Sequence, residues 1–578
     1  MVTKKQLEAG RHELRKTRRE SRKLYWAVGI FSFFANVLML TGPLYMLQVY
    51  DRVLGSRSVA TLVALSVLVL FLYTVMGVLD FVRGRIMGRV GAQFQSRLDR
   101  RVFEAVLAKS ALRPDDTSTT GLRDLESVQR LMTSPALMAL FDIPWTPFFL
   151  IAIAIFHPWL GLLALAGGLV LIALTVANQI TTRQPQGRAA MANVHSEAVS
   201  EQMRNEAEMV QAMGMRDAAF DRWQVLRANS LKEQVHAADL GGLFSSTTKS
   251  FRLFLQSAML GLGAYLVLQN ELSPGAMIAG SILMGRALAP IELAIGQWAV
   301  VQRAVKGWEN LSELLGEVPP SAPRTPLPQP QALLEVQQAT IVPPGEAQAA
   351  LRMVSFTVQP GQAVGVIGPS GAGKSSLARA LTGVWRPAAG KIRLDGASLD
   401  NYGPSMLGQY IGYLPQRVQL FDGTIAENIG KLSMNPDPAK VVEAAKKADA
   451  HAMILKLPHG YDTQMSATSG RLSGGQIQRL GLARAMYGDP VILVLDEPNS
   501  NLDNEGSQAL NRAIRQMKSE GRSVLIMAHR PSAIQECDML LMLENGARVA
   551  YGPKEDVLRE VVQNHKQIRS NTTPGGVR

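Results

Sequence analysis

The sequence predicts an all-α membrane domain with six spanning helices, followed in the same chain by a soluble α/β domain. Three observations predict this class. Apolar stretches cluster before residue 300, a proline-rich stretch follows them, and the C-terminal part has the composition of a soluble protein with glycine-rich loops. A chain of 578 residues is also too long for a single core, which favours two or three domains.

Six apolar stretches predict the membrane domain. They are residues 25–48, 59–82, 136–156, 159–180, 251–268 and 274–296. A spanning helix needs about 20 apolar residues, and most of these stretches are long enough. A buried helix of a soluble protein explains one such run, but six clustered runs favour a membrane. The fifth stretch is the weakest, because Lys249 and Arg252 lie at its start.

The positive charges indicate the orientation of the spans. The chain has a net charge of +13, and its basic N-terminus leads directly into the first apolar stretch. The two long gaps between spans are also rich in Arg and Lys, and an even number of spans places them on the side of the N-terminus. Cytosolic flanks of membrane proteins carry this excess of cations. We therefore favour a membrane protein over a nucleic-acid-binding one, with helices that continue into the cytosol and turn near residues 113–121 and 214–223.

Composition divides the chain into five segments. Residues 316–336 contain six prolines, which exclude a helix and predict a stiff linker. A single cysteine, Cys537, excludes an intrachain disulfide. The predicted segments are a basic cytosolic segment (1–24), a transmembrane domain (25–315), a linker (316–330), a soluble α/β domain (331–567) and a disordered tail (568–578).

A glycine-rich loop predicts nucleotide binding. The stretch "GPSGAGKSS", residues 368–376, fits the pattern G-x-x-x-x-G-K-[ST] between an apolar strand and a helix. Backbone N–H groups of such a loop surround phosphate oxygens, Lys374 supplies a positive charge, and Ser375 offers a hydroxyl to Mg²⁺. The predicted ATP-binding residues of this loop are Gly368, Pro369, Ser370, Gly371, Ala372, Gly373, Lys374, Ser375 and Ser376.

Two acidic residues follow a buried apolar strand in "DPVILVLDEPNSNLD". Asp496 is placed to hold Mg²⁺, and Glu497 is placed to polarise an attacking water. A solvated turn is the alternative explanation for two adjacent acids. The strand before them favours a nucleotide hydrolase.

A second stretch also has the pattern of a phosphate-binding helix start. In "GRLSGGQIQRLGLARA", residues 470–485, a serine and two glycines precede a predicted helix. Gln416 and His529 lie at the edges of other predicted strands. Spacing alone leaves both open to a purely structural role.

The order of these motifs resembles that of the ATP-binding cassette (ABC) transporters. The loop at 368–376, Gln416, "LSGGQ", "LVLDEP", "SNLD" and "AHR" follow one another along the soluble domain. The resemblance implies ATP and Mg²⁺ as cofactors, Glu497 and His529 as catalytic residues, and Ser375, Gln416 and Asp496 around Mg²⁺, partly through water. It also implies ATP contacts from Gln416, Ser473, Gly474, Gly475, Gln476 and Asp503.

The same resemblance explains why one chain carries two phosphate-binding patterns. In these transporters the "LSGGQ" loop of one cassette caps the ATP that is held by the glycine-rich loop of a second cassette. One cassette and six spans therefore imply half of a transporter. We expect a homodimer with two ATP molecules between its cassettes.

Longer stretches resemble one branch of the family. "LTGPLYMLQVYDRVLGSRS", "ALFDIPWTPFFL" and "LSPGAMIAGSILMGRALAPIE" are similar to the ATPases of bacterial type I protein secretion. This resemblance implies a bacterial inner-membrane protein, a periplasmic membrane-fusion adaptor, an outer-membrane channel, and an unfolded polypeptide substrate with a C-terminal secretion signal. Nucleic acid is not an expected partner. An ABC exporter or flippase of lipids or small hydrophobic molecules is the alternative.

Two questions stay open at the level of sequence. Related cassettes stack an aromatic ring on adenine, but "QQATIVPPGEAQ" has none, so Val342 or Pro343 is the candidate contact. Asp142 and Arg286 lie within apolar stretches. They either pair structurally or line the path of the polypeptide.

Overall fold

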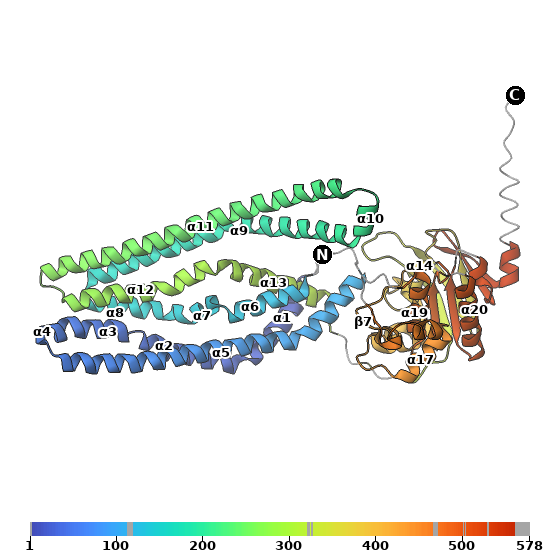
Figure 1. The fold of residues 1–578 in the computed structure, drawn as a ribbon, viewed down its shortest axis with the longest axis horizontal. Helices are drawn as coiled ribbons and strands as arrows, with labels where there is room; N and C mark the ends of the chain where they lie inside the picture. Colours follow the sequence, from blue (N-terminus) through green and yellow to red (C-terminus); the bar gives the residue numbers. More distant parts are fainter. Residues whose placement is uncertain are drawn as a thin grey trace, which may run out of the picture. The chain divides into compact units, whose positions relative to one another are not determined.

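The computed structural model describes residues 3–112, 120–320, 324, 327–465, 472–500, 502, 504–528 and 531–560. Contacts between residues divide the chain into two compact units. The first holds the described residues of Met1–Lys109 and Thr117–Pro320, and the second those of Ser110–Asp116 and Ser321–Arg578. Figure 1 shows a helical first unit and a mixed α/β second unit.

The first unit consists of helices. Their bounds are α1 Lys4–Glu20, α2 Arg22–Leu38, α3 Thr41–Gln48, α4 Leu54–Ser56, α5 Val59–Leu112, α6 Gly121–Thr133, α7 Pro135–Asp142, α8 Thr146–Phe156, α9 Pro158–Asn205, α10 Ala207–Ala212, α11 Arg216–Leu268, α12 Pro274–Gly296 and α13 Trp298–Glu317. Within the described residues, six helical segments are long and apolar enough to cross a membrane. The prediction of six spans is confirmed, and the weak fifth stretch is the end of α11.

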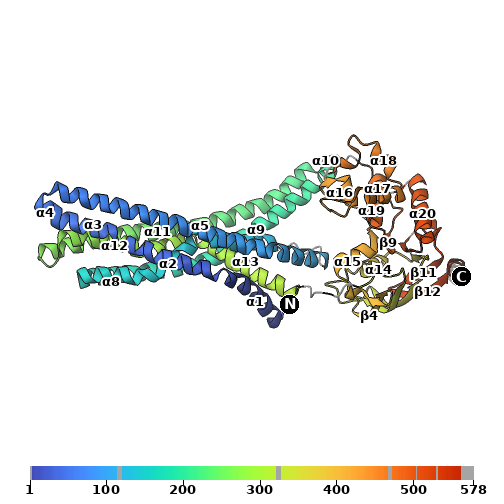
Figure 2. The ribbon, with the colours of Figure 1, turned by 90° about the horizontal axis from the view of Figure 1, so that it is seen from below.

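Three helices are much longer than a membrane requires. α5, α9 and α11 have 54, 48 and 53 residues, which corresponds to about 70–80 Å at 1.5 Å per residue. The apolar core of a bilayer is only about 30 Å thick, so these helices extend well beyond it. α9 and α11 lie side by side in both views (Figures 1 and 2). The turn predicted at 214–223 is shorter than expected, because α11 already begins at Arg216. Most of the other predicted turn lies outside the described residues.

A polar cluster joins α2, α5 and α7 inside the apolar part of this unit. The Asp142 carboxylate accepts hydrogen bonds from Asn36 Nδ2 at 2.8 Å and from Arg83 Nη1 at 3.0 Å. Asn36 and Arg83 are both buried. A charge in an apolar interior needs such a partner, so the geometry gives Asp142 a structural role. Arg286 on α12 is exposed in the single chain.

The second unit contains two main sheets. Its strands are β1 Leu334–Ile341, β2 Leu351–Val358, β3 Ala363–Ile367, β4 Ala389–Leu394, β5 Ala397–Ser398, β6 Ile411–Leu414, β7 Gly423–Thr424, β8 Gln464–Met465, β9 Ile492–Asp496, β10 Ser523–Met527, β11 Met539–Glu544 and β12 Ala547–Pro553. Its α-helices are α14 Lys374–Leu381, α15 Pro404–Tyr410, α16 Ile425–Ile429, α17 Pro438–Lys447, α18 His451–Leu455, α19 Gly474–Met486 and α20 Asn504–Ser519.

Strand order places the predicted site at the carboxyl ends of neighbouring central strands of the larger sheet. This sheet has the order β12-β11-β3-β10-β9-β6, and only β12 runs antiparallel to its neighbour. β10 pairs with both β3 and β9, so Met527 lies opposite Val366 and Asp496. The carboxyl ends of the three strands therefore meet, which is where parallel sheets bind ligands. A smaller antiparallel sheet has the order β2-β1-β4-β5.

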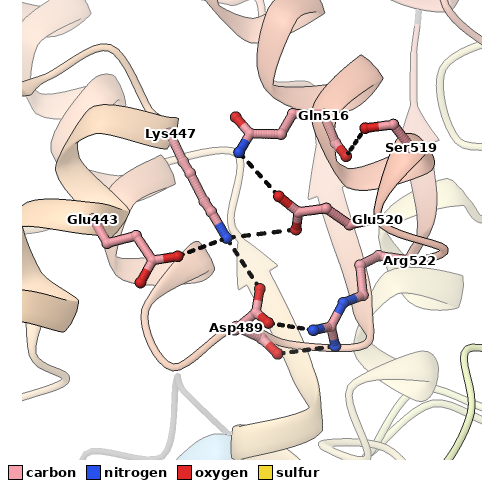
Figure 3. A network of polar contacts seen from close by, with 7 residues as sticks. All are labelled: Glu443, Lys447, Asp489, Gln516, Ser519, Glu520 and Arg522. Carbon is pink, nitrogen blue, oxygen red and sulfur yellow. Dashed lines mark hydrogen bonds and ion pairs between the residues drawn. The ribbon is translucent and has the colours of Figure 1, made fainter.

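An ionic network joins α17 to the segments before the amino ends of β9 and β10 (Figure 3). Lys447, at the end of α17, lies 3.1 Å from Glu443, 3.1 Å from Asp489 and 3.5 Å from Glu520. Arg522 forms a second ion pair with Asp489. Asp489 precedes β9, and Glu520 precedes β10. One ammonium group therefore joins α17 to the two segments that lead into these strands.

Candidate nucleotide-binding site

The glycine-rich loop lies between the buried strand β3 and helix α14. Gly371 and Gly373 have φ angles of +81° and +96°, a region that side chains other than glycine rarely adopt. A Cβ atom on Gly373 would also lie 2.7 Å from the Ala350 carbonyl oxygen. Glycine is therefore required here. The loop leads directly into the N-terminus of α14, and glycine-rich loops in this position bind phosphate through their backbone N–H groups.

Lys374 is held inside this loop. Its Nζ donates hydrogen bonds to the carbonyl oxygens of Gly368 and Pro369, both at 2.8 Å. Burial lowers the pKa of the Lys374 ammonium, while the nearby Glu497 and Asp496 carboxylates oppose that shift. The ammonium is thus a buried cation beside two acids, where an anionic phosphate stabilises it further.

Ser375 and Asp496 meet at the carboxyl edge of the sheet. Ser375 Oγ donates a hydrogen bond to Asp496 Oδ1 at 3.3 Å, and Asp496 is 3% exposed. Burial raises the pKa of the Asp496 carboxyl, and the hydrogen bond from Ser375 partly opposes this. A hydroxyl and a buried carboxylate form an oxygen donor set that fits Mg²⁺. Such an ion, when bound, neutralises phosphate charge.

A backbone hydrogen bond fixes an uncommon backbone conformation at Glu497. Its φ angle is +50°, which is uncommon for a residue with a side chain. Its N–H donates to the Met527 carbonyl oxygen at 3.0 Å, so β10 holds this conformation. Gln416 Nε2 donates to Glu497 Oε2 at 2.9 Å. The carboxylate is therefore oriented beside Lys374 and Asp496, where it can accept a proton from a water that attacks a phosphate.

The "LSGGQ" stretch forms the start of α19. Ser473 caps the helix: its Oγ accepts from Gln476 N–H at 3.3 Å, and Gln476 Oε1 accepts from Ser473 N–H at 2.9 Å. Ser473 and Gly474 are exposed, so this helix start is accessible to an anion. Within the described residues, no hydrogen bond or ion pair joins residues 472–476 to residues 368–376 of the same chain.

Other predicted contacts of this site stay predictions. Asp503 and His529 lie outside the described residues, and their roles stay predictions. Val342 and Pro343 are half-buried directly after β1. Their contact with adenine also stays a prediction.

Three side chains near the acids were not expected from the sequence. Gln478 on α19 is buried and donates through Nε2 to the Pro498 carbonyl oxygen at 3.2 Å, which links the "LSGGQ" helix to the turn after Glu497. Burial, together with the charge of Asp496, raises the pKa of Tyr413 to about 12. Asn499 is buried, and neither its Oδ1 nor its Nδ2 has a hydrogen-bond partner among the residues that the structure describes. No sequence pattern distinguished Gln478 from the other polar residues of this helix.

Comparison with known proteins agrees with this geometry. Residues 351–500 match the family described as "ABC transporter", and residues 25–289 match "ABC transporter transmembrane region". A solved structure of a bacterial Atm1-family ABC exporter with ATP bound superposes with a TM-score of 0.78. It is 22% identical and covers 96% of this chain and 99% of its own. At 22% identity, this similarity shows that the two proteins share a fold.

Relatives that match nearly the whole chain identify one branch of this family. The type I secretion system ATP-binding protein PrsD of Rhizobium meliloti (strain 1021) is 43% identical over 554 residues, which is 96% of this chain and 95% of the relative. The leukotoxin translocation ATP-binding protein LktB of Mannheimia glucosida is 26% identical over 543 residues, 93% of this chain and 77% of its own length. The chain is a multi-pass membrane protein with an ATP-binding domain, and it belongs to the ABC transporter family, in the branch of the type I secretion ATP-binding proteins.

Proposed function

We propose that this protein uses ATP hydrolysis to export an unfolded polypeptide as the ABC component of a type I secretion system. The single observation that carries this proposal is the 43% identity to a type I secretion ATP-binding protein over 96% of the chain. The relatives named for toxin translocation support the same class of substrate. The proposed substrate is a polypeptide with a C-terminal secretion signal.

The catalytic proposal rests on the meeting of five side chains. Lys374 neutralises phosphate charge, Ser375 and Asp496 hold Mg²⁺, and Glu497 acts as the general base. Gln416 orients Glu497 and joins the Mg²⁺ shell through water. The distances of 2.9 Å between Gln416 and Glu497 and 3.3 Å between Ser375 and Asp496 support these roles. His529 is proposed to contact the γ-phosphate.

The active assembly is proposed to be a homodimer. Ser473 lies at an exposed helix start, and within the described part of the chain it bonds only to its own helix, so it is available to the phosphates of a second chain. Each ATP would then lie between the glycine-rich loop of one copy and Ser473, Gly475 and Gln476 of the other. Asp503 is proposed to act across the same interface.

The proposed location is the bacterial inner membrane, with the N-terminus and the nucleotide-binding domain in the cytoplasm. The basic residues of α1 and of the long helical extensions support this orientation. Export across both membranes would require a periplasmic membrane-fusion adaptor and an outer-membrane channel. The domain limits proposed from composition are 25–315 for the membrane part and 331–567 for the cassette.

The proposal is tested by deleting the gene and comparing extracellular proteins. We expect one protein or a small set to disappear from the medium. The wild-type gene restores it, and Glu497→Gln does not. If extracellular proteins are unchanged while lipid composition or drug resistance changes, the polypeptide substrate is wrong.

A further inference from the structure

The smaller sheet of the nucleotide-binding domain has a hollow on one face. Its volume is about 700 Å³, within the range of ligand sites in proteins. β1, β2, β4 and β12 line it. None of its lining residues belongs to the predicted ATP or Mg²⁺ site, so the function proposed above does not use it.

A bulge in β1 shapes this hollow. The pairing of β1 with β2 shifts between Val336 and Ala339, and its pairing with β4 shifts between Gln337 and Thr340. Gly390 lies opposite the bulge with a φ angle of +81°, and a Cβ atom there would clash with the Gln338 carbonyl oxygen. Bulges bend strands and redirect side chains, often beside binding sites. The curvature is therefore specified by residues of the sheet itself.

The rim of the hollow is positively charged. Lys391 and Arg393 come from β4, and Arg548 comes from β12. None of these three cations forms an ion pair with another described residue, and the lining contains no carboxylate. Glu335 lies opposite Arg393 in the strand pairing. Even counting Glu335, the face keeps an excess of two positive charges.

The floor and walls of the hollow suit an extended chain. Val336 and Phe356 are buried beneath it, and the Phe356 and Tyr551 rings lie 6.1 Å apart. Gln337, Ser355 and Thr357 supply donors and acceptors along the strands. The lining residues come only from strands and their turns, so it lacks the helix start that usually holds phosphate. The Arg393 and Arg548 guanidinium groups each donate through Nη1 to a backbone carbonyl and retain other N–H groups, which match carboxylates.

We propose that this cationic hollow binds an acidic, extended segment of the exported polypeptide before its transport. The inference rests on the proposed export of a polypeptide and names a docking surface for it. Carboxylates on alternate residues of an extended chain point to the same side. They would meet Lys391, Arg393 and Arg548, while the polar side chains of the same face form hydrogen bonds with the chain between them.

The direct test is peptide binding to the full-length protein in detergent. The probe is a short fluorescent peptide in which Asp alternates with Thr, and its matched control has Asn in place of Asp. We expect the Asp peptide to bind and the Asn peptide not to bind. Lys391→Gln/Arg393→Gln should weaken binding by about three- to tenfold, which is the effect of losing two exposed charge pairs.

A matched double variant controls for net charge. Arg386→Gln/Lys440→Gln removes two exposed cations elsewhere on the same domain and should bind the Asp peptide normally. Equal weakening in both double variants would overturn the site. If Lys391→Gln/Arg393→Gln fails to bind ATP and is misfolded, the site is tested instead by hydrogen exchange of the wild-type protein with and without the Asp peptide. Protection of β1 and β4 by the Asp peptide supports the site, and unchanged exchange overturns it.

An export assay tests whether the exported polypeptide is the occupant of the hollow. The protein that disappears from the medium on gene deletion should be exported more slowly by Lys391→Gln/Arg393→Gln and normally by Arg386→Gln/Lys440→Gln. Normal export despite lost peptide binding would refute the exported polypeptide as the occupant. This outcome differs from failure of the proposed function, in which deletion itself leaves extracellular proteins unchanged.

Discussion

Replacement of Lys447 by methionine tests the ionic network in Figure 3. The Lys447 side chain is only 9% exposed, and it neutralises Glu443, Asp489 and Glu520. Methionine keeps the aliphatic packing but leaves these carboxylates without their shared cation. Removing one partner of a fully buried ion pair costs about 3–5 kcal/mol. The three carboxylates are 60%, 43% and 31% exposed, and water therefore offsets part of this. We expect a loss of about 1–3 kcal/mol.

Native-state hydrogen exchange of the α17 amides measures this free energy in the full-length protein, because it reports local opening. Lys440→Met on the same helix is the control, since Lys440 is exposed, and it should change the opening free energy by less than about 0.5 kcal/mol. Burial lowers the pKa of Lys447, but hydrogen bonds to Glu443 and Asp489 outweigh this and raise it. The stabilisation should therefore be complete below the ordinary lysine pKa and be lost only as the pH rises through the raised value. Equal effects of both substitutions would refute the role assigned to the network.

Four further predictions concern the nucleotide-binding domain. Glu497→Gln should still bind ATP but hydrolyse it about 10²–10⁴-fold more slowly, and normal turnover would exclude this base. Burial raises the pKa of Asp496, so its ionised form opposes folding at neutral pH. Asp496→Asn should therefore stabilise the metal-free protein by about 0.5–2 kcal/mol in thermal unfolding while abolishing hydrolysis; a lower melting temperature would contradict this. Gly373→Ala should lose ATP binding in a nucleotide-binding assay, because its Cβ atom would lie 2.7 Å from the Ala350 carbonyl oxygen; retained affinity would show that the loop adapts. Burial raises the pKa of Cys537 to about 12, so maleimide should label it only after unfolding, and rapid labelling of native protein would refute its burial.

Local patterns predicted the parts of the nucleotide site that are adjacent in sequence. The loop at 368–376 lies between a strand and a helix because glycines and apolar residues follow each other in a fixed order. Asp496 was predictable at the end of a buried strand, because a continuous apolar run directly precedes it. The six spans were predictable because length and hydrophobicity alone decide whether a helix can cross a membrane.

Contacts between distant residues were not predictable in this way. Gln416 and Glu497 are 81 positions apart, and only the pairing of β6 with β9 brings them within 2.9 Å. The Lys447 network joins residues from three separate segments. The hollow beside Gly390 depends on the register of β1, which a single sequence does not specify, because a bulge changes the pairing without changing the hydrophobic pattern.

A mixed dimer tests most directly whether two copies share each ATP. One copy carries Lys374→Ala, which disables its glycine-rich loop, and the other carries Ser473→Arg, which disables its "LSGGQ" loop. Each variant alone should be inactive. When they are co-expressed and purified through two different tags, one complete site forms only if the loops act between chains. We predict that vanadate-dependent nucleotide trapping returns in the mixed dimer, at about half the wild-type amount per dimer. If trapping stays absent in mixed dimers that form and remain folded, each chain completes its own site, and the account is wrong.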